Sequence, residues 1–227
     1  MPVLPVNSNE ILIFGCGSYG QICYMHLSSD SACQVIGFVQ DEPQVNLFFD
    51  KPVYRFNDIV PYPVIYFYAA VGYSELNYNR TACYLKMKNK GFLPVSYFHN
   101  SAIISPDVII GEHVYIMENS VLQTSVLIGE NTIIYMGCNI AHHSKIGNNC
   151  FLAQGVNICG YVTVGDNCFI GANALIFNNI SIGDGCVIAA GAVVKRDMPN
   201  DSTYTLSGEV IVGDAKNRFE RWVNKYR

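Results

Sequence analysis

Residues 128–158 read IGENTIIYMGCNIAHHSKIGNNCFLAQGVNI, and an aliphatic side chain returns in them at every sixth position. The same step of six continues in both directions from this stretch without a break. The full set of aliphatic positions is Ile104, Ile110, Ile116, Leu122, Ile128, Ile134, Ile140, Ile146, Leu152, Ile158, Val164, Ile170, Ile176, Ile182, Ile188 and Val194. Neither the period of a helix nor that of a single strand generates such a run. The chain is therefore predicted to turn once every six residues.

Composition limits the remaining possibilities. The chain has 227 residues, a formal net charge of −4, half of its residues apolar and only 14% charged, which fits one or two folded domains. No run of about 18 consecutive apolar residues occurs, which argues against a membrane span. The first residues carry no basic segment before an apolar run, so we expect a cytoplasmic protein with nine reduced cysteines. The 14 Lys and Arg form no basic cluster, which disfavours nucleic acid as a partner.

A hexapeptide β-helix has this six-residue pattern. Three short strands form one triangular coil of eighteen residues, and the aliphatic residue points to the axis, so fifteen steps give five coils. Small or β-branched residues four places later are predicted to fill the inner corners, among them Cys138, Cys150, Cys168 and Cys186 as packing thiols. Glycines one place later are predicted to adopt positive φ at tight turns, at Gly111, Gly129, Gly147, Gly165, Gly171 and Gly183.

Coil geometry predicts that residues eighteen apart stack directly, about 4.8 Å from one another. His142 then lies between Thr124 and Gly160, and His143 lies between Ser125 and Tyr161. Large apolar side chains are expected on the outside of the coils, where they favour self-association. These are Tyr115, Met117, Tyr135, Met136, Phe151 and Phe177.

The first hundred residues have a different rhythm. Strands are expected at residues 10–14, 35–39, 64–68 and 93–98, with helices from the first glycine motif to residue 26 and over residues 74–90. The motif Gly15-Cys16-Gly17-Ser18-Tyr19-Gly20 joins the first strand to its helix, and Asp41 follows 21 residues after Gly20, where a ribose acceptor is expected. Only one half of a dinucleotide fold fits in this length, which favours a single nucleotide over NAD. Glycines that merely form a tight turn are the alternative.

We therefore expect two domains, a βαβ nucleotide-binding domain at residues 1–100 and a β-helix at residues 101–227. A short connector is expected at residues 99–106. Residues 214–227 suggest an amphipathic helix that carries Phe219 and Trp222 and caps the last coil.

Two motifs together resemble a known family. The glycine motif at 15–20 and the stretch Asn139-Ile140-Ala141-His142-His143-Ser144-Lys145-Ile146-Gly147 are similar to those of the sugar acyltransferases that include bacillosamine and perosamine N-acetyltransferases and sialic-acid O-acetyltransferases. The resemblance implies an α/β half-Rossmann domain followed by a left-handed parallel β-helix, assembled as a homotrimer. It also implies direct transfer of acetyl from acetyl-CoA, with no metal, to the amine of a UDP- or dTDP-linked 4-amino-4,6-dideoxy sugar.

The resemblance also assigns site residues. It places the general base at His142, a role that suits an imidazole because its protonation changes near neutral pH. Gly160 stacks on His142 and lacks a side chain, so its N–H is expected to be approachable by a developing oxyanion. The resemblance assigns coenzyme contacts to Phe151, Gly160, Ala172 and Ala190. It assigns nucleotide contacts to Gly17, Ser18, Tyr19, Gln40, Asp41 and Gly72.

One position departs from the family pattern. The base is normally followed by Asp or Glu, whereas this chain has His143. Two adjacent histidines resist double protonation and titrate as a coupled pair, so the base should be weaker. Three outcomes are open: His143 replaces the carboxylate, a carboxylate arrives from another segment or subunit, or activity has been lost.

Rival functions follow from these alternatives. A sialic-acid-type O-acetyltransferase differs from an N-acetyltransferase only in the nucleophile, and an amine tolerates a weak base better than a hydroxyl does. A non-catalytic trimer that binds a nucleotide sugar is the second class, in which His142 is an ordinary surface histidine. A Cys159 acyl-enzyme is disfavoured because the family transfers directly.

Overall fold

The computed structural model describes residues 10–29, 33–61 and 65–225. Two compact units are distinguished, one made of residues 1–72 and 80–97 and the other of residues 73–79 and 98–227. The boundary at residue 97 lies three residues before the expected one at 100. No local sequence pattern indicates that residues 73–79 belong with the second unit.

The first unit is a mostly parallel sheet with helices. Its strand order is β3-β4-β2-β1-β5-β6, in which only β3 runs antiparallel to its neighbour among the described strands. Such an order, with helices joining parallel strands, fits a Rossmann-like domain. The elements are β1 (Glu10–Phe14), α1 (Ser18–Ser29), β2 (Gln34–Gln40), β3 (Leu47–Phe48), β4 (Lys51–Arg55), the 3-10 helix η1 (Phe56–Asp58), β5 (Tyr66–Ala69), α2 (Tyr78–Asn89) and β6 (Leu93–Pro94).

The first two expected strands are confirmed as β1 and β2, and α1 runs three residues past the expected end. The third expected strand is β5, although its first residue, Val64, lies outside the described residues. The second expected helix begins four residues late, because Glu75, Leu76 and Asn77 all have positive φ. The fourth expected strand splits into β6 and β7 (Tyr97–Phe98), which belong to different sheets. Strands β3 and β4 were missed.

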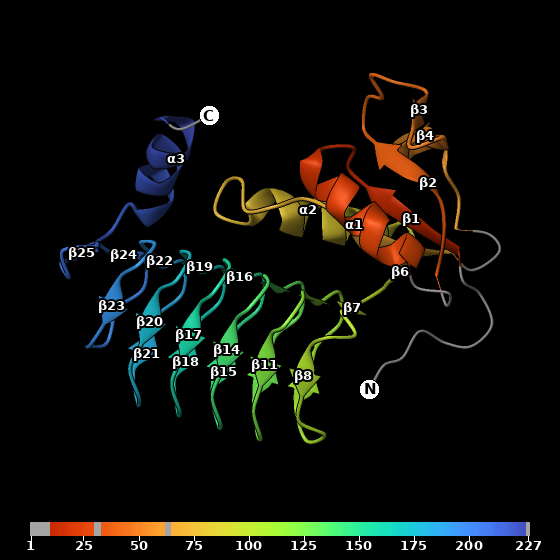
Figure 1. The fold of residues 1–227 in the computed structure, drawn as a ribbon. Coiled ribbons are helices and arrows are strands. Elements are labelled where there is room, and N and C mark those ends of the chain that lie inside the picture. The colour runs from red at the N-terminus through yellow and green to blue at the C-terminus, as the bar shows by residue number, and fades with distance from the viewer. Residues whose placement is uncertain (1–9, 30–32, 62–64, 226–227) are drawn as a thin grey trace. The chain divides into compact units, whose positions relative to one another are not determined.

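The second unit is a parallel β-solenoid with three faces (Figure 1). The first face consists of β7, β10 (Tyr115–Ile116), β13 (Ile133–Ile134), β16 (Phe151–Leu152), β19 (Phe169–Ile170), β22 (Val187–Ile188) and β24 (Ser202–Tyr204), with β25 (Val210–Val212) antiparallel at its edge. The second consists of β8 (Ile103–Ile104), β11 (Val121–Leu122), β14 (Asn139–Ile140), β17 (Asn157–Ile158), β20 (Leu175–Ile176) and β23 (Val193–Val194). The third consists of β9 (Ile109–Ile110), β12 (Leu127–Ile128), β15 (Lys145–Ile146), β18 (Thr163–Val164) and β21 (Ser181–Ile182).

The predicted period is confirmed. Strands of successive coils pair eighteen residues apart, as Val121 pairs with Asn139 and Asn139 with Asn157. The six-spaced side chains form the axial core and are buried from Ile116 to Val194, whereas Ile104 and Ile110 in the open first coil are half-buried. Burial of each large aliphatic side chain contributes about 1.5–3 kcal/mol to folding. The four corner cysteines are buried, and all nine cysteines are free thiols.

The expected reason for the recurring glycines is wrong. Gly111, Gly129 and the others of that series do not have positive φ. A Cβ on Gly147 would instead lie 2.4 Å from the Asp166 carboxylate in the next coil, so these positions are glycine because coils stack too closely for a side chain. Positive φ falls elsewhere in each corner, mostly on asparagine, which tolerates it.

Three further expectations are corrected. Residues 99–106 are not a connector but part of the first coil, where the His99 N–H donates to the Ile116 carbonyl at 2.9 Å. Helix α3 (Ala215–Lys225) does not cap the end of the solenoid: it packs against the first face, with the Phe219 ring 4.6 Å from that of Phe169. The chain instead continues past the last full coil into the β24–β25 hairpin (Figure 1).

The expected outer apolar surface is also smaller than predicted. Tyr115, Met117 and Phe151 are buried within the single chain, and Tyr135 is half-buried. Met136 and Phe177 are exposed, as expected. None of the described helices is long and apolar enough to cross a membrane.

Replacing Ile158 with Ala should test the axial core. Ile158 is 2% exposed, so we expect the free energy of unfolding to fall by about 2–5 kcal/mol through lost burial and a cavity. Thr163→Ala, at an exposed outward position of β18, is the control and should change it by less than about 0.5 kcal/mol. Urea unfolding at equal protein concentrations measures both, and equal effects would contradict the assignment of Ile158 to the core.

Candidate functional site

The two histidines occupy the corner that joins the second and third faces, between β14 and β15. The His143 N–H donates to the Thr124 carbonyl one coil earlier, at 3.1 Å. The Tyr161 N–H donates to the His142 carbonyl from one coil later, also at 3.1 Å. The predicted stacking of His142 and His143 between neighbouring coils is therefore confirmed.

The two imidazole rings face one another through their Nδ1 atoms, which lie 3.2 Å apart. The His142 N–H donates to the Gln123 side-chain oxygen at 3.1 Å, which fixes the backbone beneath the ring. Among the described residues, no carboxylate touches either ring. The contact of His142 Nδ1 is therefore with His143.

This geometry can prepare one nitrogen of His142 as a base. A hydrogen bond between two Nδ1 atoms requires a proton on one and a lone pair on the other. With His143 as acceptor, His142 carries its proton on Nδ1 and keeps the Nε2 lone pair free. When Nε2 takes up a proton, the resulting imidazolium still donates to a neutral His143.

Gly160 lies directly against the His142 ring. A Cβ built on Gly160 would lie 2.6 Å from Cε1 and 2.9 Å from Nε2 of His142, so only glycine fits there. Gly160 is buried, and its N–H donates to none of the described residues. Substitution of Gly160 would displace the imidazole.

Asp107 anchors the same corner two coils below the histidines. Its carboxylate accepts hydrogen bonds from the Thr124 hydroxyl at 2.6 Å and the Ser125 N–H at 2.8 Å. These bonds, that of the Thr124 hydroxyl foremost, hold the pKa of the Asp107 carboxyl below its ordinary value of 3.8. Thr124 in turn accepts the His143 N–H, so Asp107 orders the coil on which the histidines rest.

A shallow hollow of about 520 Å³ crosses the second face. It extends from Asn173, at the corner with the first face, to Ala141 and Cys159, which precede His142 and Gly160. Its floor includes Asn139 and Asn157, whose side chains are hydrogen-bonded at 3.1 Å. The histidine corner therefore opens onto a groove that leads across the face.

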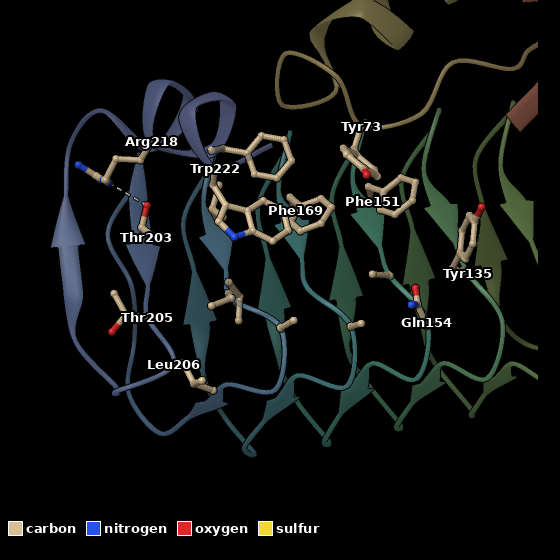
Figure 2. Close-up of a pocket in the computed structure, with 17 residues that line it drawn as sticks. Tyr73, Tyr135, Phe151, Gln154, Phe169, Thr203, Thr205, Leu206, Arg218 and Trp222 are labelled. Atoms are coloured by element: carbon tan, nitrogen blue, oxygen red, sulfur yellow. Dashed lines mark hydrogen bonds between the residues drawn. The ribbon is translucent and has the colours of Figure 1, made fainter. Parts of the chain in front are cut away.

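A larger pocket of about 690 Å³ lies on the first face and at its corner with the second (Figure 2). It contains Phe151, Ala172 and Ala190, three of the four residues to which the resemblance assigns coenzyme contacts. The fourth, Gly160, lies apart from them at the histidine corner. Along the wall, the rings of Tyr73, Phe151, Phe169 and Trp222 follow one another on the same face (Figure 2).

Most of the aromatic wall was missed from the sequence. Phe151 and Phe169 are eighteen residues apart, and their rings stack at 5.7 Å, which the coil arithmetic could have shown. Tyr73 contacts both rings from the segment 73–79, with centroids 5.1 and 5.2 Å away. Asn77 holds that segment by a 3.1 Å hydrogen bond to the Cys168 carbonyl. No local signal marks these contacts, which join residues far apart in sequence.

The expected nucleotide residues gather in the first unit. Phe14 of β1 pairs in register with Val39 and Ala69, so the carboxyl ends of β2, β1 and β5 lie at one edge of the sheet. Gln40 is the last residue of β2, and the residues that follow the three strands include Gly17, Ser18, Asp41 and Gly72. Tyr19 lies on α1, with its hydroxyl 3.1 Å from that of Tyr68.

The glycines of this motif have separate roles. A Cβ on Gly20 would lie 2.3 Å from the Gly15 carbonyl oxygen, so Gly20 allows α1 to pack on the loop. A Cβ on Gly17 would meet nothing within 4 Å, and the same is true of Gly72. Turn geometry therefore explains Gly20 but leaves the open space over Gly17 and Gly72 available to a ligand.

Asp41 has a partner that the sequence did not indicate. Its carboxylate forms an ion pair with Lys86 of α2, whose ammonium also lies 4.2 Å from the centroid of the Phe56 ring. The neighbouring Gln40 side-chain oxygen is buried and accepts no hydrogen bond from the described residues. The edge thus offers a carboxylate, a cation and an unused acceptor.

Three cysteine thiols have pKa values raised by burial. Burial raises the pKa of Cys16 to about 11 and that of Cys138 to about 12. Burial, then the charge of Asp41, raises the pKa of Cys83 to about 11 although Lys86 lowers it. A thiol with such a pKa is protonated at neutral pH and is a poor nucleophile. Within the described residues, no three or more His, Cys, Asp or Glu side chains are arranged to bind a metal.

Residues 125–196 carry hexapeptide repeats. The hexapeptide repeat of succinyl-transferase matches residues 161–196, and the bacterial transferase hexapeptide (six repeats) matches residues 125–160 and 143–178. No protein of curated function matches the sequence significantly.

Solved structures share the fold. Perosamine N-acetyltransferase from Caulobacter crescentus, a histidine-to-asparagine variant in complex with CoA and GDP-perosamine, is 24% identical with a TM-score of 0.81, over 89% of this chain and 96% of that one. The acetyltransferase domain of PglB from Neisseria gonorrhoeae, in complex with acetyl coenzyme A, is 21% identical with a TM-score of 0.63, over 87% and 96%. WeeI from Acinetobacter baumannii is 18% identical with a TM-score of 0.76, over 88% and 99%. The likeness identifies the solenoid as the left-handed type.

Replacing Asp107 with Asn should weaken folding in a pH-dependent way. Because the pKa of this carboxyl is lowered in the folded chain, its charge stabilises the fold above the unfolded-state pKa of about 4, and the contribution is lost as the pH falls through the folded-state pKa. We expect the variant to unfold at a lower urea concentration than the wild type at neutral pH. The difference between the two urea midpoints should become smaller below about pH 4. Glu209→Gln is the control. A gap that is the same at every pH would show that the charge is not responsible.

Proposed function

We propose that this chain is an acetyl-CoA-dependent N-acetyltransferase that acts on the amine of a nucleotide-linked amino sugar. The observation that carries the proposal is the His142 imidazole at a solenoid corner, with Nδ1 held by His143 and the ring against Gly160. The same fold in a perosamine N-acetyltransferase, solved with CoA and GDP-perosamine, supports it.

In the proposed mechanism His142 is the general base. The sugar amine attacks the thioester carbonyl as a neutral nitrogen and must lose a proton as the new C–N bond forms. Nε2 of His142 accepts that proton while Nδ1–H continues to donate to His143. The C–S bond then breaks, the thiolate of coenzyme A leaves with the electron pair, and it takes the proton from Nε2 of His142, which returns the imidazole to its neutral form.

The Gly160 N–H is proposed to stabilise the carbonyl oxygen as it becomes negative. It donates to no described residue, and the bare Cα lets the His142 ring lie directly beside it. Because Gly160 is buried beneath the His142 ring, base and oxyanion donor would act on opposite ends of the same reacting group. No covalent intermediate with Cys159 is needed.

Coenzyme and nucleotide are assigned to separate places. Phe151, Ala172 and Ala190 are proposed to contact the coenzyme in the 690 Å³ pocket of the solenoid. Gly17, Ser18, Gln40, Asp41 and Gly72 are proposed to hold the nucleotide, with Tyr19 beside them. The open space over Gly17 and the Lys86 ammonium suit a diphosphate. We propose a UDP- or dTDP-linked 4-amino-4,6-dideoxy sugar as the acceptor.

A homotrimer is proposed as the active assembly. In one chain the second face separates the coenzyme pocket from the histidine corner, and the 520 Å³ hollow lies between them. If two copies pack with these corners adjacent, the pocket of one chain meets His142 of its neighbour. Exposed Met136 and Phe177 supply apolar contact area for such packing.

Incubation of the protein with acetyl-CoA and a panel of UDP-, dTDP- and GDP-linked amino sugars tests the proposal. We expect thiol release and an acetamido product with at least one UDP or dTDP acceptor. His142→Asn should lower kcat by about 10²- to 10⁴-fold because the base is removed, whereas Cys159→Ala should retain kcat within about twofold. Turnover only on hydroxyl acceptors would favour O-acetylation, and binding of nucleotide sugars without turnover would favour a non-catalytic trimer.

Replacing His143 with Asp should restore a carboxylate beside the base. Asp tolerates the positive φ of 60° at this position, so the fold should be kept. A carboxylate stabilises the imidazolium more than a neutral ring does, so we expect a higher plateau rate and an acid limb of the pH–rate profile moved to higher pH. His143→Asn, which adds no charge, should not move the limb upward. An unchanged profile in His143→Asp would mean that residue 143 does not contact the base.

A further inference from the structure

Tyr161 has a backbone conformation that aromatic residues rarely adopt. Its φ is 59°, in the left-handed region. Equivalent corner positions of the solenoid that are not glycine also have positive φ. Most of them carry a small polar residue, namely Asn119, Ser125, Asn131, Asn149, Asn167, Asn173 and Asn179. The exceptions in this corner series are Tyr161 and two histidines, His113 and His143. Strained backbone of this kind concentrates at functional sites.

The two exceptions at the exposed corner contact each other. The Tyr161 ring stacks on the His143 ring, with centroids 4.7 Å apart and planes 16° apart. It also meets the His142 ring edge to face, at 5.2 Å and 83°. His113, by contrast, is buried and bonded to Asn131 through its ring, which accounts for it structurally.

Stacking of this kind restricts a side chain that is otherwise unrestrained. His143 is exposed, and the described contacts of its ring are with His142 and Tyr161. An exposed imidazole exchanges among several rotamers, and only some of them aim Nδ1 at His142. The flat contact with Tyr161 selects the plane in which the 3.2 Å approach of the two Nδ1 atoms occurs.

We propose that Tyr161 is a positioning residue that holds the His143 ring so that its Nδ1 accepts a hydrogen bond from the Nδ1–H of His142. The inference rests on the proposed function, because it matters to catalysis only if His142 is the base. Tyr161 would act through the rings it orients and would not itself exchange a proton with the substrate.

Other titratable groups around the pair do not provide this restraint. Two coils below, the Asp107 carboxylate accepts hydrogen bonds from Thr124 and Ser125. On the same coil, Lys145 lies two residues further along and points outward from β15, and on the coil above the Cys159 thiol precedes Gly160. None of them touches either ring, and Tyr161 is the one titratable neighbour in contact among the described residues.

The decisive variant is Tyr161→Asn, which places at this corner the residue found at most equivalent positions. Relief of backbone strain should raise Tm by about 2–4 °C, while kcat falls roughly tenfold and the acid limb of the pH–rate profile moves to lower pH. Tyr161→Phe keeps the stacking ring and should retain the wild-type kcat and profile. Asn167→Tyr, at an equivalent corner remote from the histidines, should lower Tm and leave kcat unchanged.

Imidazole ¹⁵N NMR provides a readout that does not depend on turnover. In the wild type and in Tyr161→Phe we expect two different Nδ1 chemical shifts, one typical of a protonated nitrogen and one of an unprotonated nitrogen. In Tyr161→Asn we expect the Nδ1 shifts of His142 and His143 to move to intermediate, similar values, because each nitrogen then carries the proton part of the time. If the NMR signals change as expected but no acceptor is acetylated, the positioning role of Tyr161 is supported and the proposed function is wrong. If Tyr161→Asn keeps the wild-type kcat, profile and NMR signals, the positioning role is overturned.

Discussion

The direct stacking of each residue on the one eighteen positions away is the constraint on which the second unit depends. Parallel pairing of successive coils in register gives each side chain of the inner coils a fixed neighbour above and below, while the inward aliphatic side chains fill the axis. Close approach of the coils also removes the side chain wherever one would strike the next turn, as at Gly147 and Gly160. The imidazole of His142 sits over a bare Cα because the repeat places it there.

That constraint explains how a histidine can stand in for a carboxylate. A carboxylate would stabilise the imidazolium through charge, whereas a neutral ring offers only a directed lone pair, which is useful solely in the correct orientation. The corner supplies orientation from three sides: Thr124 holds the His143 backbone, Gln123 holds the His142 backbone, and Tyr161 stacks on the ring. In the proposed mechanism, this fixed orientation keeps the Nδ1–H of His142 directed at His143 while Nε2 faces the amine.

The sequence was informative where structure follows from counting along the chain. The period of six located the core, and the interval of eighteen placed Gly160 against His142 and Tyr161 against His143 before any coordinates were known. Counting could not reveal packing between distant segments. Docking of Tyr73 on Phe151 and Phe169, the position of α3 on the first face and the pairing of Asp41 with Lys86 all depend on tertiary contacts without a local pattern. The wrong prediction of positive φ at the recurring glycines has a related cause. Either an unusual φ or a lack of space for a side chain can require glycine, and the sequence alone does not distinguish the two.

The close stacking of successive coils at their corner glycines has an evolutionary consequence. Because each turn meets its neighbours through the same spacing, a whole turn can be duplicated or lost without disturbing the contacts of those that remain. The prism would lengthen or shorten in increments of about 4.8 Å, while the wall on which any side chain stands would be preserved. The length of the solenoid can therefore change in evolution without altering the contacts of the two imidazole rings.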